Sequence, residues 1–225
     1  MSDYLPLCAF RQGLLPPSCR TCAWWQTTGH TDLPPQMAAD KRRQWMTGIE
    51  STWGHPGLLL ESTVSEDATA GCGAPVVVGS ISYAPAAAVP RLRGLPFDSL
   101  AEGSALLFCL WLDEDQPRMQ GKRLLQKALG QLKTRGITDA FAVAGSPDDL
   151  RRNHDHSWRP CPHQLFSQEL LEANGFVPVA MNGGLVLMRA DLRGLLSIIG
   201  QVETVLRRAI RQPTPSPAAW TTRGP

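Results

Sequence analysis

Hydrophobic and polar positions follow one another in two different periods along this chain, and each period predicts a different element. Apolar residues recur at helical spacing over residues 35–53, 121–135, 163–174 and 191–211, which predicts four amphipathic helices. Short apolar runs predict strands over residues 58–63, 75–84, 104–112, 137–144, 176–181 and 185–190, and the run over 75–84 is rich in Val and Ile. The run over residues 104–112 is apolar without interruption, as expected of a central strand that is covered on both faces.

The order of these elements predicts the fold class. Asn182-Gly183-Gly184 separates the last two strands and favours a hairpin, whereas helices separate several of the others. This mixture of hairpins and crossover helices predicts an α/β (α+β) domain with a mixed central sheet and flanking helices. We expect an irregular segment over residues 1–34 that packs on the core, the main domain over 35–190, a C-terminal helix over 191–212 and a disordered tail over 213–225.

Composition and charge narrow the classes of function. Of the 225 residues 43% are hydrophobic and 19% are charged, which supports a packed core rather than a disordered chain. The net charge of +2 gives no electrostatic reason to expect a nucleic-acid partner. No apolar run reaches the length of a membrane span, and the first residues lack the pattern of a secretory signal. These patterns predict a cytoplasmic protein, a monomer or homodimer, with no membrane or nucleic-acid partner.

The strongest candidate for chemistry is the polar loop after the apolar run. It reads Asp-Glu-Asp-Gln-Pro-Arg-Met-Gln-Gly over residues 113–121, and a predicted helix follows it. A loop between a strand and a helix presents unpaired backbone N–H groups and the positive end of the helix dipole, which together favour a phosphate. An ordinary α/β crossover with a polar loop is the alternative interpretation.

This stretch resembles the GNAT-type N-acetyltransferases, whose loop Gln/Arg-x-x-Gly-x-Gly/Ala holds the pyrophosphate of CoA. Gln116, Met119 and Gly121 occupy the three motif positions, and the Leu-Leu-Glu-Ala-Asn-Gly-Phe run ending at Phe176 resembles a second family signature. The resemblance covers roughly residues 57–190 and implies a GNAT-like fold with acetyl-CoA as cofactor. The cofactor-binding residues that it implies are Cys109, Leu110, Trp111, Leu112, Gln116, Arg118, Met119, Gln120, Gly121, Lys122 and Asn174.

The resemblance also implies a reaction, namely transfer of an acetyl group to a primary amine of a small molecule or peptide by direct attack. The thioester would lie along residues 105–112, where a backbone N–H would polarise its carbonyl. Three positions depart from the family pattern: Met119 replaces a glycine, Pro117 removes one N–H, and Leu171 stands where many members have a tyrosine acid. A catalytically impaired GNAT-fold protein that binds CoA or regulates a partner is therefore the alternative function.

The sequence offers three candidates for catalytic acid–base chemistry, namely Glu61, Asp113 and Tyr83, with Glu50 as a further carboxylate. The alternative, which the sequence favours, is that each carboxylate is a solvated surface group and that Tyr83 packs in the core. The acceptor itself is expected to contact the two variable connections over residues 85–103 and 145–162.

A zinc site is a further hypothesis. Cys19-x-x-Cys22 has the spacing of half a zinc site, and the following Trp24-Trp25 gives a looser resemblance to a subgroup of actinobacterial GNAT proteins. That resemblance implies zinc held by Cys19, Cys22, Cys161 and one of His55 or His163, fastening the N-terminal segment to the core. The alternative is that these cysteines are buried thiols.

Overall fold

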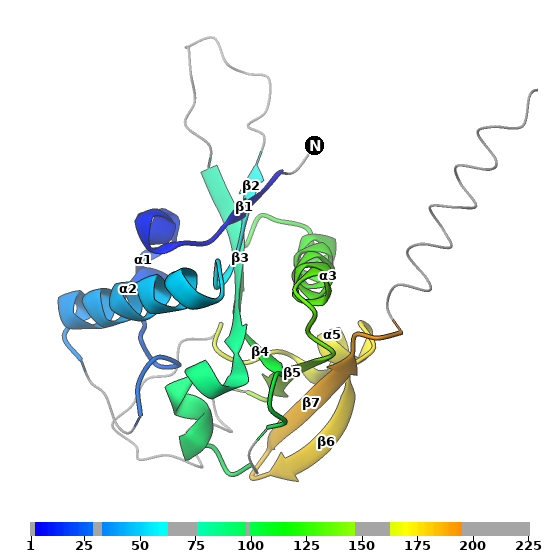
Figure 1. Cartoon of the computed structure of the whole chain (residues 1–225). Coiled ribbons are helices and arrows are strands. Elements are labelled where there is room, and N and C mark those ends of the chain that lie inside the picture. The colour runs from blue at the N-terminus through cyan, green and yellow to red at the C-terminus, as the bar shows by residue number, and fades with distance from the viewer. Residues whose placement is uncertain (1–2, 29–32, 63–75, 98–99, 147–162, 195–225) are drawn as a thin grey trace, which may run out of the picture. The chain divides into compact units, whose positions relative to one another are not determined.

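A seven-stranded mixed sheet in the order β1-β2-β3-β4-β5-β7-β6 forms the centre of the protein (Figure 1). This computed structural model describes residues 3–28, 33–62, 76–97, 100–146 and 163–194. All neighbouring strands are antiparallel except β4 and β5, which run parallel. The strands are β1 (Asp3–Pro6), β2 (Gly57–Ser62), β3 (Val76–Pro85), β4 (Ala105–Leu112), β5 (Asp139–Ala144), β6 (Val177–Asn182) and β7 (Leu185–Asp191).

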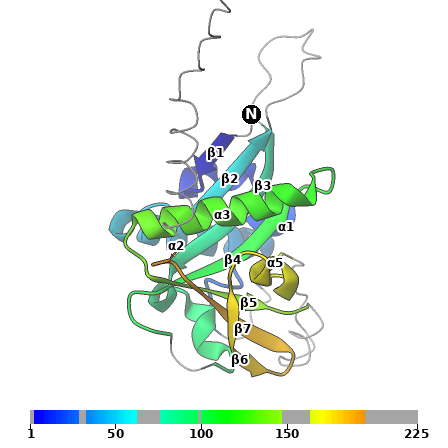
Figure 2. The same cartoon turned by 90° about the vertical axis from the view of Figure 1, so that its right-hand side faces the viewer.

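Helices cover both faces of the sheet. Helices α1 (Pro17–Arg20) and α2 (Pro35–Thr52) lie on one side, and α3 (Arg118–Thr134) and α5 (Gln168–Glu172) lie on the other (Figures 1 and 2). Helix α3 crosses β2, β3 and β4, and the inward residues of its amphipathic pattern are buried: Leu124, Leu125, Ala128, Leu129 and Leu132. Among the described residues, no helix combines the length and apolar character that crossing a membrane requires.

These observations confirm the predicted mixed sheet with flanking helices, and β4 matches the uninterrupted apolar run, since its first five residues are buried. The N-terminal segment differs from the prediction. The sequence predicts an irregular stretch over residues 1–34, but Asp3–Pro6 forms β1, and the 3₁₀-helix η1 (Ala9–Leu14) and the short helix α1 follow it. Four residues that end in a proline carry too little alternation to be recognised, and the strand exists because β2 offers an edge with which it pairs.

The helix predicted over residues 163–174 is shorter in the structure. Residues before Ser167 run alongside β5 instead, because Phe166 donates its N–H to Val143 and accepts one from Gly145. The Ser167 hydroxyl then caps α5 by accepting the N–H of Leu170 at 3.2 Å. Of the predicted C-terminal helix, Asp191 is instead the last residue of β7, and residues 195–225 lie outside the described part of the chain.

Candidate functional site

Strand β4 separates from β5 halfway along its length. The two strands pair only over Ala105–Leu107 with Ala140–Ala142, whereas β4 continues to Leu112. On its other side, Ser82 lies opposite Phe108 but Ser80 lies opposite Trp111, so β4 carries one extra residue. Cys109 sits in this bulge with a φ of 55°, the only positive φ of a non-glycine residue in the described segments. Among the described strands, none pairs with β4 on the side of β5 over Leu110–Leu112, and this stretch is called the open edge of β4 below; the bulge before it redirects the backbone groups.

The N-terminus of α3 follows directly after this open edge. Pro117 occupies the N-cap position, no side chain caps the helix, and its first turn contains no acidic residue. The preceding loop is held by its own hydrogen bonds, since Gln116 and Asp115 donate their N–H groups to Asp113. Uncapped N–H groups at the positive end of a 17-residue helix are suited to binding an anion.

The substitution of the motif glycine by Met119 has a modest structural effect. Met119 lies inside the first turn of α3, where φ is negative, and its side chain is 56% exposed. The position therefore needs no glycine for its backbone conformation, and the side chain points to solvent. Pro117 likewise precedes the first helical N–H, so its missing donor is not one of the helix's own.

Gly121 brings α3 close to β4. A Cβ atom at Gly121 would lie 3.9 Å from Leu110 and 4.0 Å from Leu112, both on the separated half of β4. Most of the predicted cofactor-binding residues thus lie at one end of the sheet. Cys109–Leu112 belong to β4, Gln116 to the following loop, and residues 118–122 to α3.

Asn174 belongs to a separate element on the same side of the sheet. It follows α5, and its Nδ2 donates to the carbonyl of Leu170 at 2.7 Å, while its Oδ1 is buried without a hydrogen-bond partner in the described residues. Leu171 is fully buried in the same helix. The position of the family's tyrosine acid is therefore filled by a core side chain.

The candidate carboxylates lie at the same end of the sheet as the loop. The N–H of Asp113 donates to Val78 of β3, and Glu61 pairs with Val77 on the other side of that strand. Because neighbouring strands lie about 4.8 Å apart, the backbones of Asp113 and Glu61 are about 10 Å apart across β3. The Glu61 Oε1 is buried and has no hydrogen-bond partner in the described segments. Glu50, in contrast, accepts the N–H of Ala9 at 2.6 Å and so fixes the N-terminal segment.

Tyr83 faces α3 rather than the open edge of β4. Its hydroxyl donates to Gln131 Oε1 at 2.5 Å, and its ring packs against Trp53 with the guanidinium of Arg135 at 5.4 Å. Burial raises the pKa of Tyr83 to about 12, and Arg135 opposes that shift. A catalytic role for Tyr83 stays a prediction, and in this position the phenol packs α3 on β3.

The opposite face of β4 is covered by the N-terminal segment. Trp24 and Trp25 are both buried, and the Trp25 ring lies 5.4 Å from that of Phe108. Two buried arginines support this segment, because Arg42 donates to the carbonyls of Cys19 and Cys22, and Arg91 donates to the carbonyl of Trp24. The sequence gives no signal for these arginines, since arginine is mostly exposed and nothing in their spacing marks them. The tryptophans act here as core residues.

The predicted zinc ligands are only partly within the described chain. Cys19 is buried, Cys22 is half-buried, His55 is exposed, and Cys161 lies outside the described residues. Among the described residues, no group of three or more His, Cys, Asp or Glu side chains is close enough to hold a metal ion. Burial lowers the pKa of His163. The described geometry gives zinc no support.

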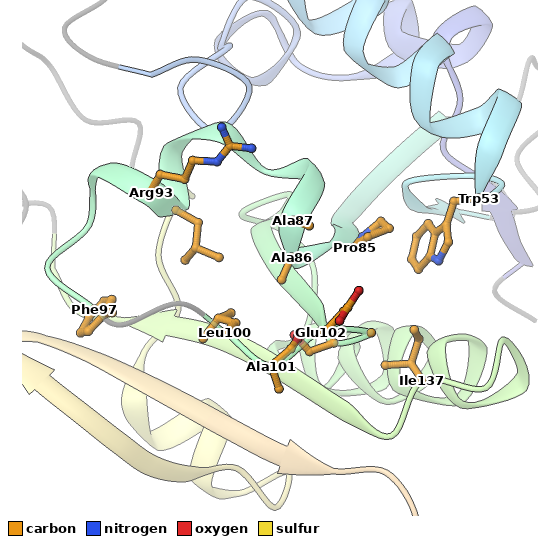
Figure 3. Close-up of a pocket in the computed structure, with 13 residues that line it drawn as sticks. Trp53, Pro85, Ala86, Ala87, Arg93, Phe97, Leu100, Ala101, Glu102 and Ile137 are labelled. Atoms are coloured by element: carbon orange, nitrogen blue, oxygen red, sulfur yellow. The ribbon is translucent and has the colours of Figure 1, made fainter.

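A cavity of about 650 Å³ lies at the other end of β4 (Figure 3). Trp53 and Ile137 stand at one end of it, and Phe97 and Leu100 at the other. The connection over residues 85–103 supplies most of its lining, and contact of this connection with an acceptor stays a prediction. Eight residues of β4 separate Ser104 in the cavity from the loop before α3, which corresponds to about 25 Å. The cavity is therefore distinct from the end of the sheet at which α3 begins.

The fold is similar to that of solved proteins described as acetyltransferases. One is an N-acetyltransferase from Staphylococcus aureus Mu50, with a TM-score of 0.51 and 14% identity over 85% of this chain and 99% of that one. Another is YncA from Salmonella typhimurium, solved with its cofactor acetyl-CoA, with a TM-score of 0.50 and 14% identity over 85% of this chain and 94% of that one. No protein-family model and no curated protein matches the sequence. At this identity the likeness concerns the fold, and the chain has the fold of the GNAT-type N-acetyltransferases.

Proposed function

We propose that the protein is an acetyl-CoA-dependent N-acyltransferase that acts on a primary amine of a small molecule or peptide. One observation carries this proposal, namely the open edge of β4 with its bulge at Cys109, directly before the uncapped N-terminus of α3. A site of this shape can hold an extended chain along the strand and a phosphate at the helix. CoA has both parts, and YncA, which shares the fold, was solved with acetyl-CoA.

Different residues at this end of the sheet would bind different parts of the cofactor. The N–H groups of Arg118 and Met119 and the positive end of α3 would bind the pyrophosphate, and the Arg118 and Lys122 side chains add positive charge. The pantetheine arm would pair with the edge of β4 over Leu110–Leu112. The Asn174 Oδ1 is buried and has no hydrogen-bond partner among the residues that the structure describes, so it would gain from an N–H donor such as the amides of that arm.

The chemistry needs few side chains because the thioester is already activated. A backbone N–H next to the bulge would donate to the carbonyl oxygen, where negative charge develops during attack by the amine. Asp113 at the exit of β4 is our first candidate to accept the amine proton because Glu61 lies beyond β3. Four strand residues, about 13 Å, separate Asp113 from the bulge, so the proton would reach it through water. With Leu171 in place of a tyrosine, the CoA thiolate would leave without a phenolic acid.

A second function is favoured by the packing around β4. Leu171 is fully buried, and the Trp24–Trp25 pair covers the face of β4 opposite α3. A GNAT-fold protein that binds CoA without transferring its acyl group, and that regulates a partner, fits these features. Binding and transfer must therefore be measured separately.

Thermal unfolding tests the binding step. Acetyl-CoA at 100 times its Kd should stabilise the protein by about 2.7 kcal/mol, and CoA without its 3′-phosphate shows whether that group contributes. Transfer is then measured by mass spectrometry on a panel of alkyl amines, amino acids and short peptides. An acetylated amine supports the enzyme, and stabilisation without product from any amine supports the regulatory alternative. The absence of stabilisation at millimolar acetyl-CoA would contradict both.

A further inference from the structure

The cavity at the end of β4 that lies away from α3's N-terminus is large and mostly apolar. Its volume of about 650 Å³ falls within the range of pockets that bind small molecules in proteins. Aliphatic, proline and aromatic side chains supply most of its lining, and among the described residues that line it only Arg93 and Glu102 are charged. A space of this kind is suited to the hydrocarbon body of a small molecule.

The Trp53 indole forms one wall of the cavity, and residues outside the cavity lining hold it in place. The guanidinium of Arg135 lies over the indole at 4.4 Å from the ring centroid, and the ring of Tyr83 packs edge-on against it at 6.1 Å. Arg135 is itself held, because it donates to the carbonyl of His55 at 3.1 Å. Trp53 therefore presents a preformed surface, which lowers the ordering cost of binding a ligand.

The opposite wall is anchored in the core. Leu92, Phe97 and Leu100 are half-buried and pack against the apolar cluster that contains Phe108 of β4. The N–H of Phe97 also donates to the carbonyl of Leu95 at 2.8 Å. Both walls of the cavity thus belong to the folded core, and the space between them is available to a ligand.

A closed turn over residues 101–104 fixes the backbone of Glu102. The N–H and the hydroxyl of Ser104 both donate to the carbonyl of Ala101, at 3.2 and 2.6 Å. Gly103 has a φ of 77°, the positive value that a type II turn requires at its third position. Glu102, the residue before it, is therefore presented from a rigid corner at the edge of the cavity.

The charge of Glu102 is available to a ligand. Figure 3 shows its carboxylate between the two walls, whereas the guanidinium of Arg93 points away from Phe97 and Leu100. Within the described chain, no hydrogen bond or ion pair engages the Glu102 carboxylate, and none joins it to Arg93. The cavity therefore combines an apolar interior with one accessible negative charge, which is complementary to an apolar cation.

We propose that this cavity binds a small molecule with an apolar body and one positively charged amine. The body would fill the space between Trp53 and Phe97, and the ammonium group would pair with Glu102. Five residue steps along β4, about 16 Å, separate Ser104 from the bulge at Cys109, so an amine held by Glu102 is not the amine that would be acetylated. The cavity is thus a second ligand site, and binding there requires neither acetyl-CoA nor acyl transfer.

Three probes with the same phenylbutyl body test this proposal by calorimetric titration of the intact protein without acetyl-CoA. Phenylbutylamine is cationic at neutral pH, phenylbutanol is neutral and phenylbutyrate is anionic. We expect the amine to bind at least about five times more tightly than the carboxylate, with the alcohol between them, because Glu102 attracts the first and repels the second. No binding of the amine at millimolar concentration, or equal affinities for the amine and the carboxylate, would overturn the proposal.

Two variants locate the binding, and a third is their control. Glu102→Gln should lower the affinity for the amine to that for the alcohol and leave the alcohol unaffected. Glu114→Gln removes an exposed carboxylate at the other end of β4 and should bind all three probes as the wild type does. Ala101→Trp should abolish binding of all three, because the indole fills the cavity. Equal effects of the two glutamine variants, or amine binding that survives Ala101→Trp, would refute the assignment of this site.

Discussion

Cys109 is the residue at which β4 leaves its regular course. Its φ of 55° is costly for any side chain and most of all for a β-branched one. We expect Cys109→Val to lower the free energy of unfolding by about 1–2 kcal/mol and to weaken acetyl-CoA binding, since relief of the strain removes the bulge. Cys109→Gly is the matched variant, because it keeps the conformation and should bind normally. Urea denaturation and ligand titration measure both effects, and a Val variant as stable as the Gly variant would contradict the account.

The raised pKa of Tyr83 predicts how the stability of the protein changes at alkaline pH. Its pKa is about 12 in the folded protein and 10.0 in the unfolded chain, so the folded state binds the proton more tightly between these values. The stability that this proton supplies is present below about pH 10 and is lost as the pH rises toward 12, at most about 2–3 kcal/mol.

Tyr83→Phe removes this titration. The variant should lose about 1 kcal/mol at neutral pH, with the hydrogen bond to Gln131, and then show a flatter alkaline stability profile than the wild type. Chemical denaturation between pH 8 and pH 11 measures this. If Tyr83 only packs α3 on β3, the variant should bind acetyl-CoA and transfer its acetyl group as the wild type does. A loss of transfer with normal binding would instead support a catalytic role for Tyr83.

At the scale of elements, the strand–loop–helix unit was predictable because its parts are local. An apolar run of strand length, a polar loop and a helical stripe of leucines each leave their mark in consecutive residues. The bulge was not predictable, because it depends on the register of β4 against β3, which no single segment encodes. The early separation from β5 is equally a property of two strands together.

The connection between β3 and β4 supplies a second test at this scale. Ala101 is exposed and lines the cavity at the far end of β4, so Ala101→Trp should fill that space without strain. Because about 25 Å separates this cavity from the N-terminus of α3, acetyl-CoA affinity should stay within about twofold of the wild type. Titration of the variant checks this, and a large loss of affinity would mean that the cofactor lies elsewhere.

At the scale of the whole molecule, the fold class followed from element order, but the N-terminal segment did not. Its irregular-looking sequence becomes ordered through distant partners: β2 pairs with β1, Arg42 holds Cys19 and Cys22, and Gln164 accepts from Trp25. Contacts over such separations leave no periodic signal in the sequence. The candidate site shows the same division, since its strand, loop and helix were predictable from local patterns, whereas the bulge at Cys109 was not.

The central claim is that the N-terminus of α3 binds the phosphates of acetyl-CoA, and one pair of variants tests it. Met119→Glu and Gln126→Glu each add one carboxylate to an exposed position of α3, the first within its first turn and the second two turns later. A carboxylate near a helix N-terminus favours the helix, so neither variant should unfold more readily without ligand. Calorimetric titration with acetyl-CoA should show a loss of about tenfold or more, roughly 1.4 kcal/mol, for Met119→Glu and less than about twofold for Gln126→Glu. Equal affinities for the two variants would contradict the account.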